Sequence, residues 1–240
     1  MQAWHVSDLD PRKLFVHQES AESSEFIKVS RPTALAPVSF TITQQQGPIK
    51  IKGWEKDGIF LKISRKGSKE ALANTTVTID KSKLPQELSC TVVKKDENGP
   101  VAEVTFNAKV PFSCNAAASS RRGMIRTKRI TGAQNLSTEN GPISIMLEKF
   151  TIDSSIFAQS AYGNISVQAP QKIQANLSAT TWRGSVTSEL PVTLRPQTTL
   201  LNNDFWKRMK QEAHGMLGEG GAPITLETEH GHIALLKLAK

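Results

Sequence analysis

The densest group of side chains that could do chemistry is basic. Five cations fall within one short stretch: Arg121, Arg122, Arg126, Lys128 and Arg129. In an extended strand, Arg126 and Lys128 point to the same side, opposite Ile125 and Thr127. Such clusters can clamp phosphate or sulfate groups, which makes these five residues candidates for anion binding. The simpler interpretation, which we favour from the sequence alone, is a solvated strand face that discourages edge pairing.

A second basic group lies earlier in the chain and comprises Lys62, Arg65, Lys66 and Lys69. Base-stacking aromatic residues are not interleaved with the cations along the sequence. We therefore expect no specific binding of single-stranded nucleic acid.

Two histidines, His230 and His232, flank Gly231 and follow Glu227 and Glu229. In a strand the two rings would point to the same side, as two ligands of a divalent metal do. No third ligand can be identified by spacing. We expect a solvated turn of mixed charge at this place and no metal site.

Candidate catalytic residues are weak. No Gly-x-Ser-x-Gly elbow occurs, and neither Cys90 nor Cys114 has a histidine nearby in the sequence, so we expect buried structural thiols. Whether the two cysteines pair stays open. Glu148, Asp153 and Glu189 do not recur at equivalent positions, so we expect a non-catalytic protein without a cofactor.

Composition narrows the class of protein. The 240 residues carry 30 Lys and Arg against 22 Asp and Glu, a net charge of +8, and 38% are hydrophobic. This mix excludes a disordered or collagen-like chain, and two cysteines are too few for a disulfide scaffold. No window approaches the roughly 18 apolar residues of a membrane span, and the first ten residues lack the features of a signal peptide. The expectation is a cytoplasmic protein, or one from which an export signal was removed.

A short motif, which we call the glycine phrase, recurs along the chain and indicates the strands that position these residues. It consists of Gly, any residue, and then Ile or Val. Its glycines are Gly47, Gly99, Gly123, Gly141, Gly163, Gly184 and Gly231. The steps from Gly99 onward are 24, 18, 22, 21 and 47 residues, a period near 20 that is typical of stacked repeats. Alternating segments such as Ile165, Val167 and Ala169 follow the glycines and predict half-buried strands. We expect these glycines to form tight or left-handed turns, so a valine at Gly163 or Gly184 should impair folding if those glycines adopt positive φ.

Two segments break the pattern. Residues 201–217 carry apolar residues at helical spacing, among them Phe205, Met209 and Ala213, so we expect a short helical insertion. Lys207, Arg208 and Lys210 make this helix basic; it could lie on a membrane surface, but packing over the fold is the simpler expectation. Residues 1–36 are expected to form an irregular N-terminal arm or cap.

The repeats resemble the bacterial putative-adhesin family. The resemblance is carried by residues 160–170 (SAYGNISVQAP), residues 173–186 (IQANLSATTWRGSV) and the closing residues 222–233 (APITLETEHGHI). The early residues 46–54 (QGPIKIKGW) resemble the opening turn of the family. The family implies a right-handed parallel β-solenoid and a location at the bacterial surface or envelope. It offers no catalytic residues to carry over.

Together these observations predict an all-β, right-handed parallel β-solenoid over residues 37–240, preceded by the N-terminal cap. The expected function is non-catalytic, adhesin-like binding through an extended sheet face, with an anionic glycan or another envelope component as partner. Two alternatives remain. One is a β-helix enzyme that acts on polysaccharides, as a lyase or glycosidase; the other is a self-assembling scaffold.

Overall fold

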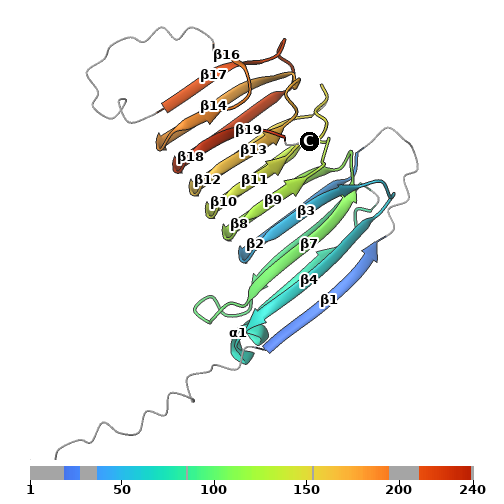
Figure 1. Cartoon of the computed structure of the whole chain (residues 1–240). Helices are drawn as coiled ribbons and strands as arrows, with labels where there is room; N and C mark the ends of the chain where they lie inside the picture. Colours follow the sequence, from blue (N-terminus) through green and yellow to red (C-terminus); the bar gives the residue numbers. More distant parts are fainter. Residues whose placement is uncertain (1–18, 28–36, 85, 153, 195–210, 239–240) are drawn as a thin grey trace, which may run out of the picture.

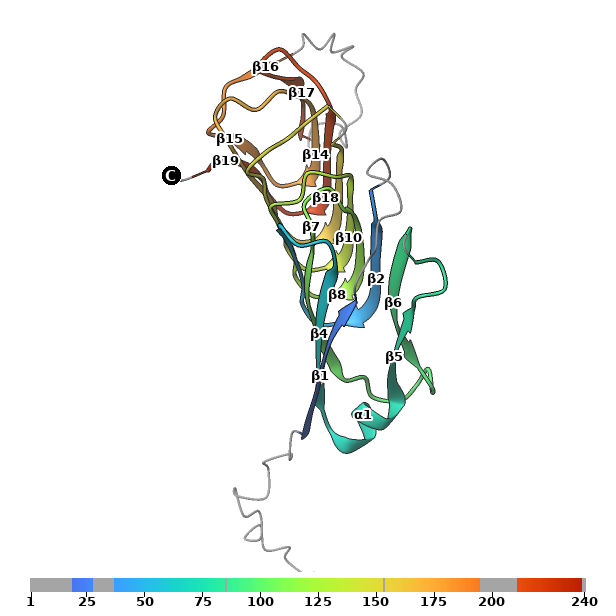
Figure 2. The ribbon, with the colours of Figure 1, turned by 90° about the vertical axis from the view of Figure 1, so that its right-hand side faces the viewer.

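Strands dominate the computed structural model, which describes residues 19–27, 37–84, 86–152, 154–194 and 211–238. They form two sheets that lie face to face, as the two views of the ribbon show (Figures 1 and 2). The expectation of an all-β chain is therefore confirmed at the level of class. Within the described residues no helix is long and apolar enough to cross a membrane.

Sheet A has nine strands. In spatial order they are β1 (Glu19–Ile27), β4 (Ile59–Gly67), β7 (Glu103–Pro111), β3 (Ile49–Trp54), β9 (Ile125–Lys128), β11 (Ile143–Met146), β13 (Ile165–Ala169), β19 (Ile233–Lys237) and β15 (Val186–Ser188).

Sheet B has ten strands. In spatial order they are β16 (Val192–Leu194), β17 (Gln211–Leu217), β14 (Ala175–Arg183), β18 (Pro223–His230), β12 (Ile156–Tyr162), β10 (Gln134–Asn140), β8 (Asn115–Arg122), β2 (Ser39–Gln46), β6 (Glu87–Lys94) and β5 (Thr75–Asp80).

Alternation of apolar and polar residues explains why these segments are strands. In β3, Ile49 and Ile51 are buried while Lys50 and Lys52 are exposed; in β13, Ile165 and Val167 are buried. Side chains at period two point to opposite faces of a sheet. The inward sets from both sheets merge into one hydrophobic core cluster, and the outward sets remain for solvent or a partner.

Most of the chain alternates between the sheets. A strand of sheet B is followed by a strand of sheet A, and we call each such pair a coil. Neighbouring coils pair in parallel, for example β8 with β10 and β9 with β11. Antiparallel pairs occur toward the ends of the stack, where β1 and β7 flank β4, β5 pairs with β6, and β14 and β16 flank β17.

The coils do not stack in the order of the sequence. The last coil, β18 and β19, lies between the coil of β12 and β13 and the coil of β14 and β15. At the other end, the coil of β2 and β3 lies between that of β6 and β7 and that of β8 and β9. The order of the glycine phrases along the chain therefore does not give the order of their strands in space.

Six of the seven repeat glycines stack on one another. A Cβ atom at Gly141 would lie 2.2 Å from the carbonyl oxygen of Gly123, and one at Gly163 would lie 2.0 Å from that of Gly141. Close approach of neighbouring coils is thus the reason for glycine. Gly163 and Gly184 are not among the positive-φ residues, so close packing and not a left-handed turn accounts for glycine at these two positions. Gly99 lies outside the stack, beside the Asn74 side chain.

The helical insertion is wrong for residues 211–217, and residues 201–210 lie outside the described residues. Residues 211–217 form β17, antiparallel to β14. Gly215 and Leu217 are buried at period two, so inward alternation outweighs the helical spacing. The single described helix is instead α1 (Lys69–Asn74), whose first turn is capped by the Ser68 hydroxyl, which accepts from the Ala71 backbone N–H at 3.1 Å.

The irregular N-terminal cap is also wrong in part. Residues 19–27 form β1, which pairs along its whole length with β4. This pairing covers the edge of β4, since an unpaired strand would present open N–H and C=O groups. Residues 1–18 and 28–36 lie outside the described residues.

Candidate functional site

The five basic residues singled out from the sequence do not form one site. Arg126 and Lys128 lie on the outward face of β9 in sheet A. Arg121 lies on sheet B, where its Nε is 3.0 Å from a carboxylate oxygen of Glu139, and Arg122 is exposed at the end of β8. Arg129 follows β9. The fold therefore keeps two of the five on a common strand face.

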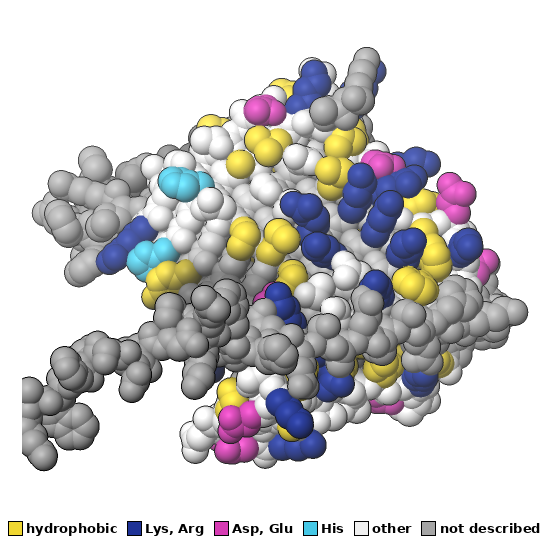
Figure 3. Space-filling model, turned by 60° about the horizontal axis from the view of Figure 1, so that its bottom comes forward, with side chains coloured by type: hydrophobic (Ala, Val, Ile, Leu, Met, Phe, Trp, Pro, Cys, Tyr) yellow, Lys and Arg dark blue, Asp and Glu magenta, His cyan; other side chains and the backbone are white. Residues whose placement is uncertain are grey.

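The fold brings other cations to Arg126 and Lys128. A hollow of about 370 Å³ lies on the outward face of sheet A. Its cationic lining residues come from four adjacent strands: Lys50, Lys52, Lys62, Lys109, Arg126 and Lys128. Among the described side chains that line it there is no Asp or Glu. Figure 3 shows Lys and Arg side chains gathered on one part of the surface.

The register of the strands sets these cations in two rows that cross the sheet. In one row Lys109 of β7, Lys52 of β3 and Lys128 of β9 are direct cross-strand partners. In the other row Lys50 is directly opposite Arg126. Three like-charged pairs thus lie side by side, at the spacing of about 4.8 Å between strands. Direct like-charge pairs weaken a sheet, so this arrangement has an energetic cost in the absence of an anion.

Aromatic rings lie at one side of these rows. The Lys109 ammonium lies 5.6 Å from the centre of the Trp54 ring and 5.8 Å from that of Phe60. Lys56 approaches the Trp54 ring to 5.5 Å, and the indole N–H donates to the carbonyl of Gly58 at 2.9 Å. The cation–π contacts and the hydrogen bond fix the Trp54 ring beside the cations.

The hollow is continued by two more, of about 300 and 400 Å³, around Arg129. Arg129 is the one non-glycine residue with positive φ (61°) in the described ranges. Its Nε lies 2.8 Å from a Glu148 carboxylate oxygen, and its guanidinium lies 5.1 Å from the centre of the Phe112 ring. A Cβ at Gly53 would lie 1.9 Å from the Arg129 carbonyl oxygen, so glycine is required there. We call the three connected hollows the cationic trough.

Sequence reasoning missed most of the trough. Lys50, Lys52 and Lys109 come from segments outside the two basic clusters, and only the alternating Ile-Lys-Ile-Lys of β3 marked an outward cationic face. Two aromatic rings, those of Trp54 and Phe60, nevertheless lie beside the cations of the trough in space. The absence of specific nucleic-acid binding stays a prediction.

The two histidines are not brought together as a pair of ligands. The His230 ring stacks on Tyr162 with centroids 4.8 Å apart, whereas His232 Nδ1 accepts from the backbone N–H of Ser185 at 3.1 Å. In the described part of the chain, no group of three or more His, Cys, Asp or Glu residues could hold a metal ion.

The remaining candidates occupy separate places. Cys90 and Cys114 are both buried thiols of the core, as expected. Glu148 pairs with Arg129, while Glu189 accepts from the backbone N–H of Lys237 at 3.0 Å. Two strands, β13 and β19, separate β11 from β15, whose ends carry these carboxylates. Asp153 lies outside the described residues.

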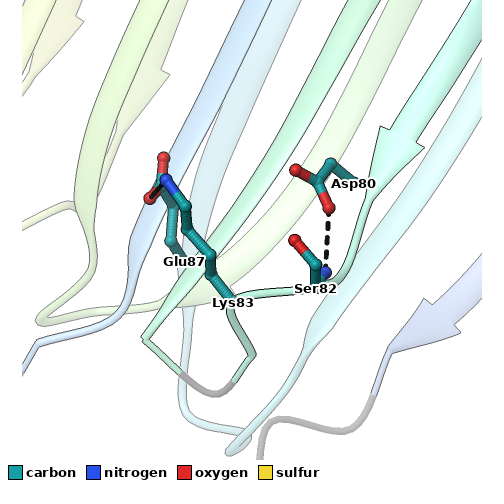
Figure 4. Close-up of polar contacts among 4 residues, drawn as sticks. All are labelled: Asp80, Ser82, Lys83 and Glu87. Atoms are coloured by element: carbon teal, nitrogen blue, oxygen red, sulfur yellow. Dashed lines mark hydrogen bonds and ion pairs between the residues drawn. The ribbon is translucent and has the colours of Figure 1, made fainter.

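Among the described carboxylates, Asp80 has a perturbed pKa; it is the last residue of β5, where the loop to β6 begins (Figure 4). Hydrogen bonds from the side chain and the backbone N–H of Ser82 lower the pKa of Asp80, and the N–H lies 2.9 Å from the carboxylate. Nearby, Lys83 and Glu87 form an exposed ion pair at 3.2 Å. This loop closes the hairpin of β5 and β6 in sheet B, whereas the cationic trough lies on the outward face of sheet A.

Comparison with known proteins identifies solved structures that are similar to this chain. No family model matches the sequence, and no curated protein matches it. A solved structure from Clostridium sporogenes ATCC 15579, described as a putative cell adhesion protein, is similar with a TM-score of 0.66 at 12% identity, over 91% of this chain and 100% of that one. A putative adhesin from Bacteroides fragilis NCTC 9343 matches 91% of this chain and 97% of its own at 12% identity, with a TM-score of 0.30. The Clostridium protein and this chain share a fold.

Proposed function

We propose that this protein is a non-catalytic binding protein that holds an anionic polysaccharide in the cationic trough, at the bacterial surface or envelope. The observation that carries the proposal is the row of directly opposed cations Lys109, Lys52 and Lys128. The name of the Clostridium protein, which refers to cell adhesion, agrees with this class of function.

The energetics favour an anionic partner. Like charges directly opposite each other on neighbouring strands destabilise a sheet, and this face carries three such pairs. If Ser, Thr or Gln stood in place of every second Lys on this face, the strands would be equally well solvated and the charge repulsion would be absent. A bound polyanion removes the repulsion and gains charge-assisted hydrogen bonds, so the unfavourable arrangement is consistent with a binding role.

The shape of the trough favours an extended ligand. Its cations lie on successive strands, so a chain of anionic units that crosses the strands meets one cation at each step. Trp54 and Phe60 offer flat apolar faces beside the charges, which suits sugar rings. Parallel pairing of neighbouring coils makes this face long. We propose that the stacked coils, from the one of β2 and β3 to the one of β14 and β15, are a β-solenoid segment.

The experiment measures binding of fluorescent heparin and polygalacturonate, with dextran as the neutral polymer. We expect both polyanions to bind with an affinity that falls as salt rises, and dextran not to bind. A triple variant, K52Q/K109Q/K128Q, should bind about tenfold more weakly, since three exposed charge contacts of about 0.5 kcal/mol each sum to about 1.5 kcal/mol.

A matched control variant distinguishes binding at the trough from attraction to the overall positive charge of the protein. K69Q/K95Q/K172Q removes three exposed lysines outside the trough and gives the same net charge. We expect it to bind the polyanions as the unmodified protein does. Equal losses in both triple variants, or no binding of either polyanion, would contradict the proposal. Tighter binding of a single-stranded oligonucleotide than of either glycan would show that the ligand class is wrong.

The polysaccharide-cleaving alternative is favoured by one observation. One end of the trough is lined by both acidic and basic side chains, an arrangement that could act on a uronate chain. These side chains are Glu55, Glu148, Arg129 and Lys149. Incubation with polygalacturonate tests it directly. Release of reducing ends that is lost in E55Q or E148Q would establish cleavage, and binding without release would support the non-catalytic function.

A further inference from the structure

A second hollow lies on the opposite sheet, and its chemistry differs from that of the trough. It has a volume of about 300 Å³ and lies on the outward face of β10, β12, β18 and β14 in sheet B. We propose that this hollow binds a neutral sugar ring against Trp182, as a second ligand site that does not depend on the cationic trough.

The register of four strands builds the hollow. Thr138, Ser160, Thr228 and Thr181 are cross-strand partners, which places the next residue of each strand in an outward row. That row reads Glu139, Ala161, Glu229 and Trp182. Because Ala161 is small, a gap opens between Glu139 on one side and Glu229 with Trp182 on the other.

Trp182 supplies a flat apolar wall. Its side chain is 49% exposed, on a strand whose inward residues, among them Ala179 and Thr181, are fully buried. An exposed indole on a rigid strand offers a large face at a low entropic cost, and it binds ligands that have an apolar face and a polar rim. The C–H face of a sugar ring is such a surface.

The rest of the lining can bind hydroxyl groups. Gln159 offers a donor and an acceptor, Glu227 and Glu229 offer acceptors, and Ser137 and Thr180 offer hydroxyls. Glu139 is held to one side by Arg121 at 3.0 Å. The carboxylates would repel an anionic sugar, so the expected ligand is neutral, and a few polar groups around an apolar wall are the usual composition of a small-ligand site.

The test uses three neutral trisaccharides, cellotriose, mannotriose and N-acetylated chitotriose, with the full chain and titration calorimetry. We expect at least one to bind with an affinity that does not change with salt. W182A should weaken that binding about fivefold or more, the value of one aromatic stacking contact, and W182F should retain part of it. A161L fills the gap without removing any polar group and should abolish binding.

Two variants serve as controls. F157A removes another exposed aromatic residue from the outward face of β12, at the other end of the strand, and should bind as the unmodified protein does. K52Q/K109Q/K128Q should also leave this binding unchanged, which separates the second site from the trough.

Several results would overturn the inference. They are the failure of all three sugars to bind, binding that persists in folded W182A or A161L, and an equal loss in F157A. Salt-sensitive binding of choline that is lost in E229Q, with no binding of the sugars, would show that the hollow takes an organic cation instead.

Discussion

The hydroxyl of Ser160 donates a hydrogen bond to the carbonyl oxygen of Gly141, 3.0 Å away on the neighbouring coil. The same contact recurs along the stack, always from the residue three positions before a repeat glycine. The other donors and acceptors are Thr138 to Gly123, Thr228 to Gly163 and Thr181 to Gly231. At these four places the glycine phrase is therefore a longer one, in which a hydroxyl satisfies the glycine carbonyl of the neighbouring coil. The first coils differ: the carbonyl of Gly47 accepts from the Gln44 side-chain amide, and the buried hydroxyl of Ser120, three positions before Gly123, has no hydrogen-bond partner among the described residues.

Loss of one such hydroxyl should destabilise the protein measurably. We expect S160A to lower the free energy of unfolding by about 1–2 kcal/mol, because a buried carbonyl loses its side-chain partner. Urea denaturation followed by circular dichroism measures this. S119A, which removes an exposed hydroxyl on β8, should change stability by less than about 0.5 kcal/mol. Equal effects of the two variants would contradict the role of the hydroxyl.

A side chain at a stacked glycine should do more damage. A Cβ at Gly163 would lie 2.0 Å from the Gly141 carbonyl oxygen, so G163A must push two coils apart. We expect a loss of about 3 kcal/mol or more, or failure to fold. At Gly67 the nearest atom to a new Cβ is 3.2 Å away, so G67A should be tolerated far better. Similar melting temperatures for both variants would mean that the coils are less closely packed than described.

The cross-strand repulsion in the trough predicts that a cation can be removed with a gain in stability. Lys52 faces Lys109 on one side and Lys128 on the other. K52Q should therefore raise the free energy of unfolding at low salt by up to about 1 kcal/mol, the size of an exposed charge interaction. High salt should abolish the gain, since it screens exposed charges. Thermal melts at both salt concentrations test this, with K95Q as the exposed control; a loss of stability in K52Q at low salt would be the contrary result.

The lowered pKa of Asp80 predicts a pH-dependent contribution to stability. Hydrogen bonds from Ser82 favour the charged carboxylate in the folded protein, so the folded pKa lies below the unfolded one. The stabilisation is therefore complete above the unfolded pKa and is lost as the pH falls through the folded value.

An NMR titration of the Asp80 carboxyl carbon measures this pKa. S82A removes the side-chain hydrogen bond and should move the pKa back toward its ordinary value. D80N should remove this part of the acid dependence of unfolding. An unchanged Asp80 pKa in S82A would assign the shift to another group.

Local patterns in the sequence were enough to predict most of the strands. Alternation as in Ile165 and Val167 depends on neighbours along the chain, and it marked most of the coils correctly. A helical spacing that includes Ala213 and Met216 was misleading in residues 211–217, where pairing with β14 selects the strand. Ser68 followed by Lys-Glu-Ala-Leu-Ala was a readable signal for α1 that the strand repeat obscured.

The sequence by itself determined the class of fold and the close approach of the coils, because strand periodicity and the glycine phrase are local properties. Only the tertiary structure decided which coils are neighbours, since every coil that carries the phrase presents the same backbone edge and can pair with any other. That choice places β18 and β19 inside the stack. It also assembles Lys109, Lys52 and Lys128 from three distant segments into one face.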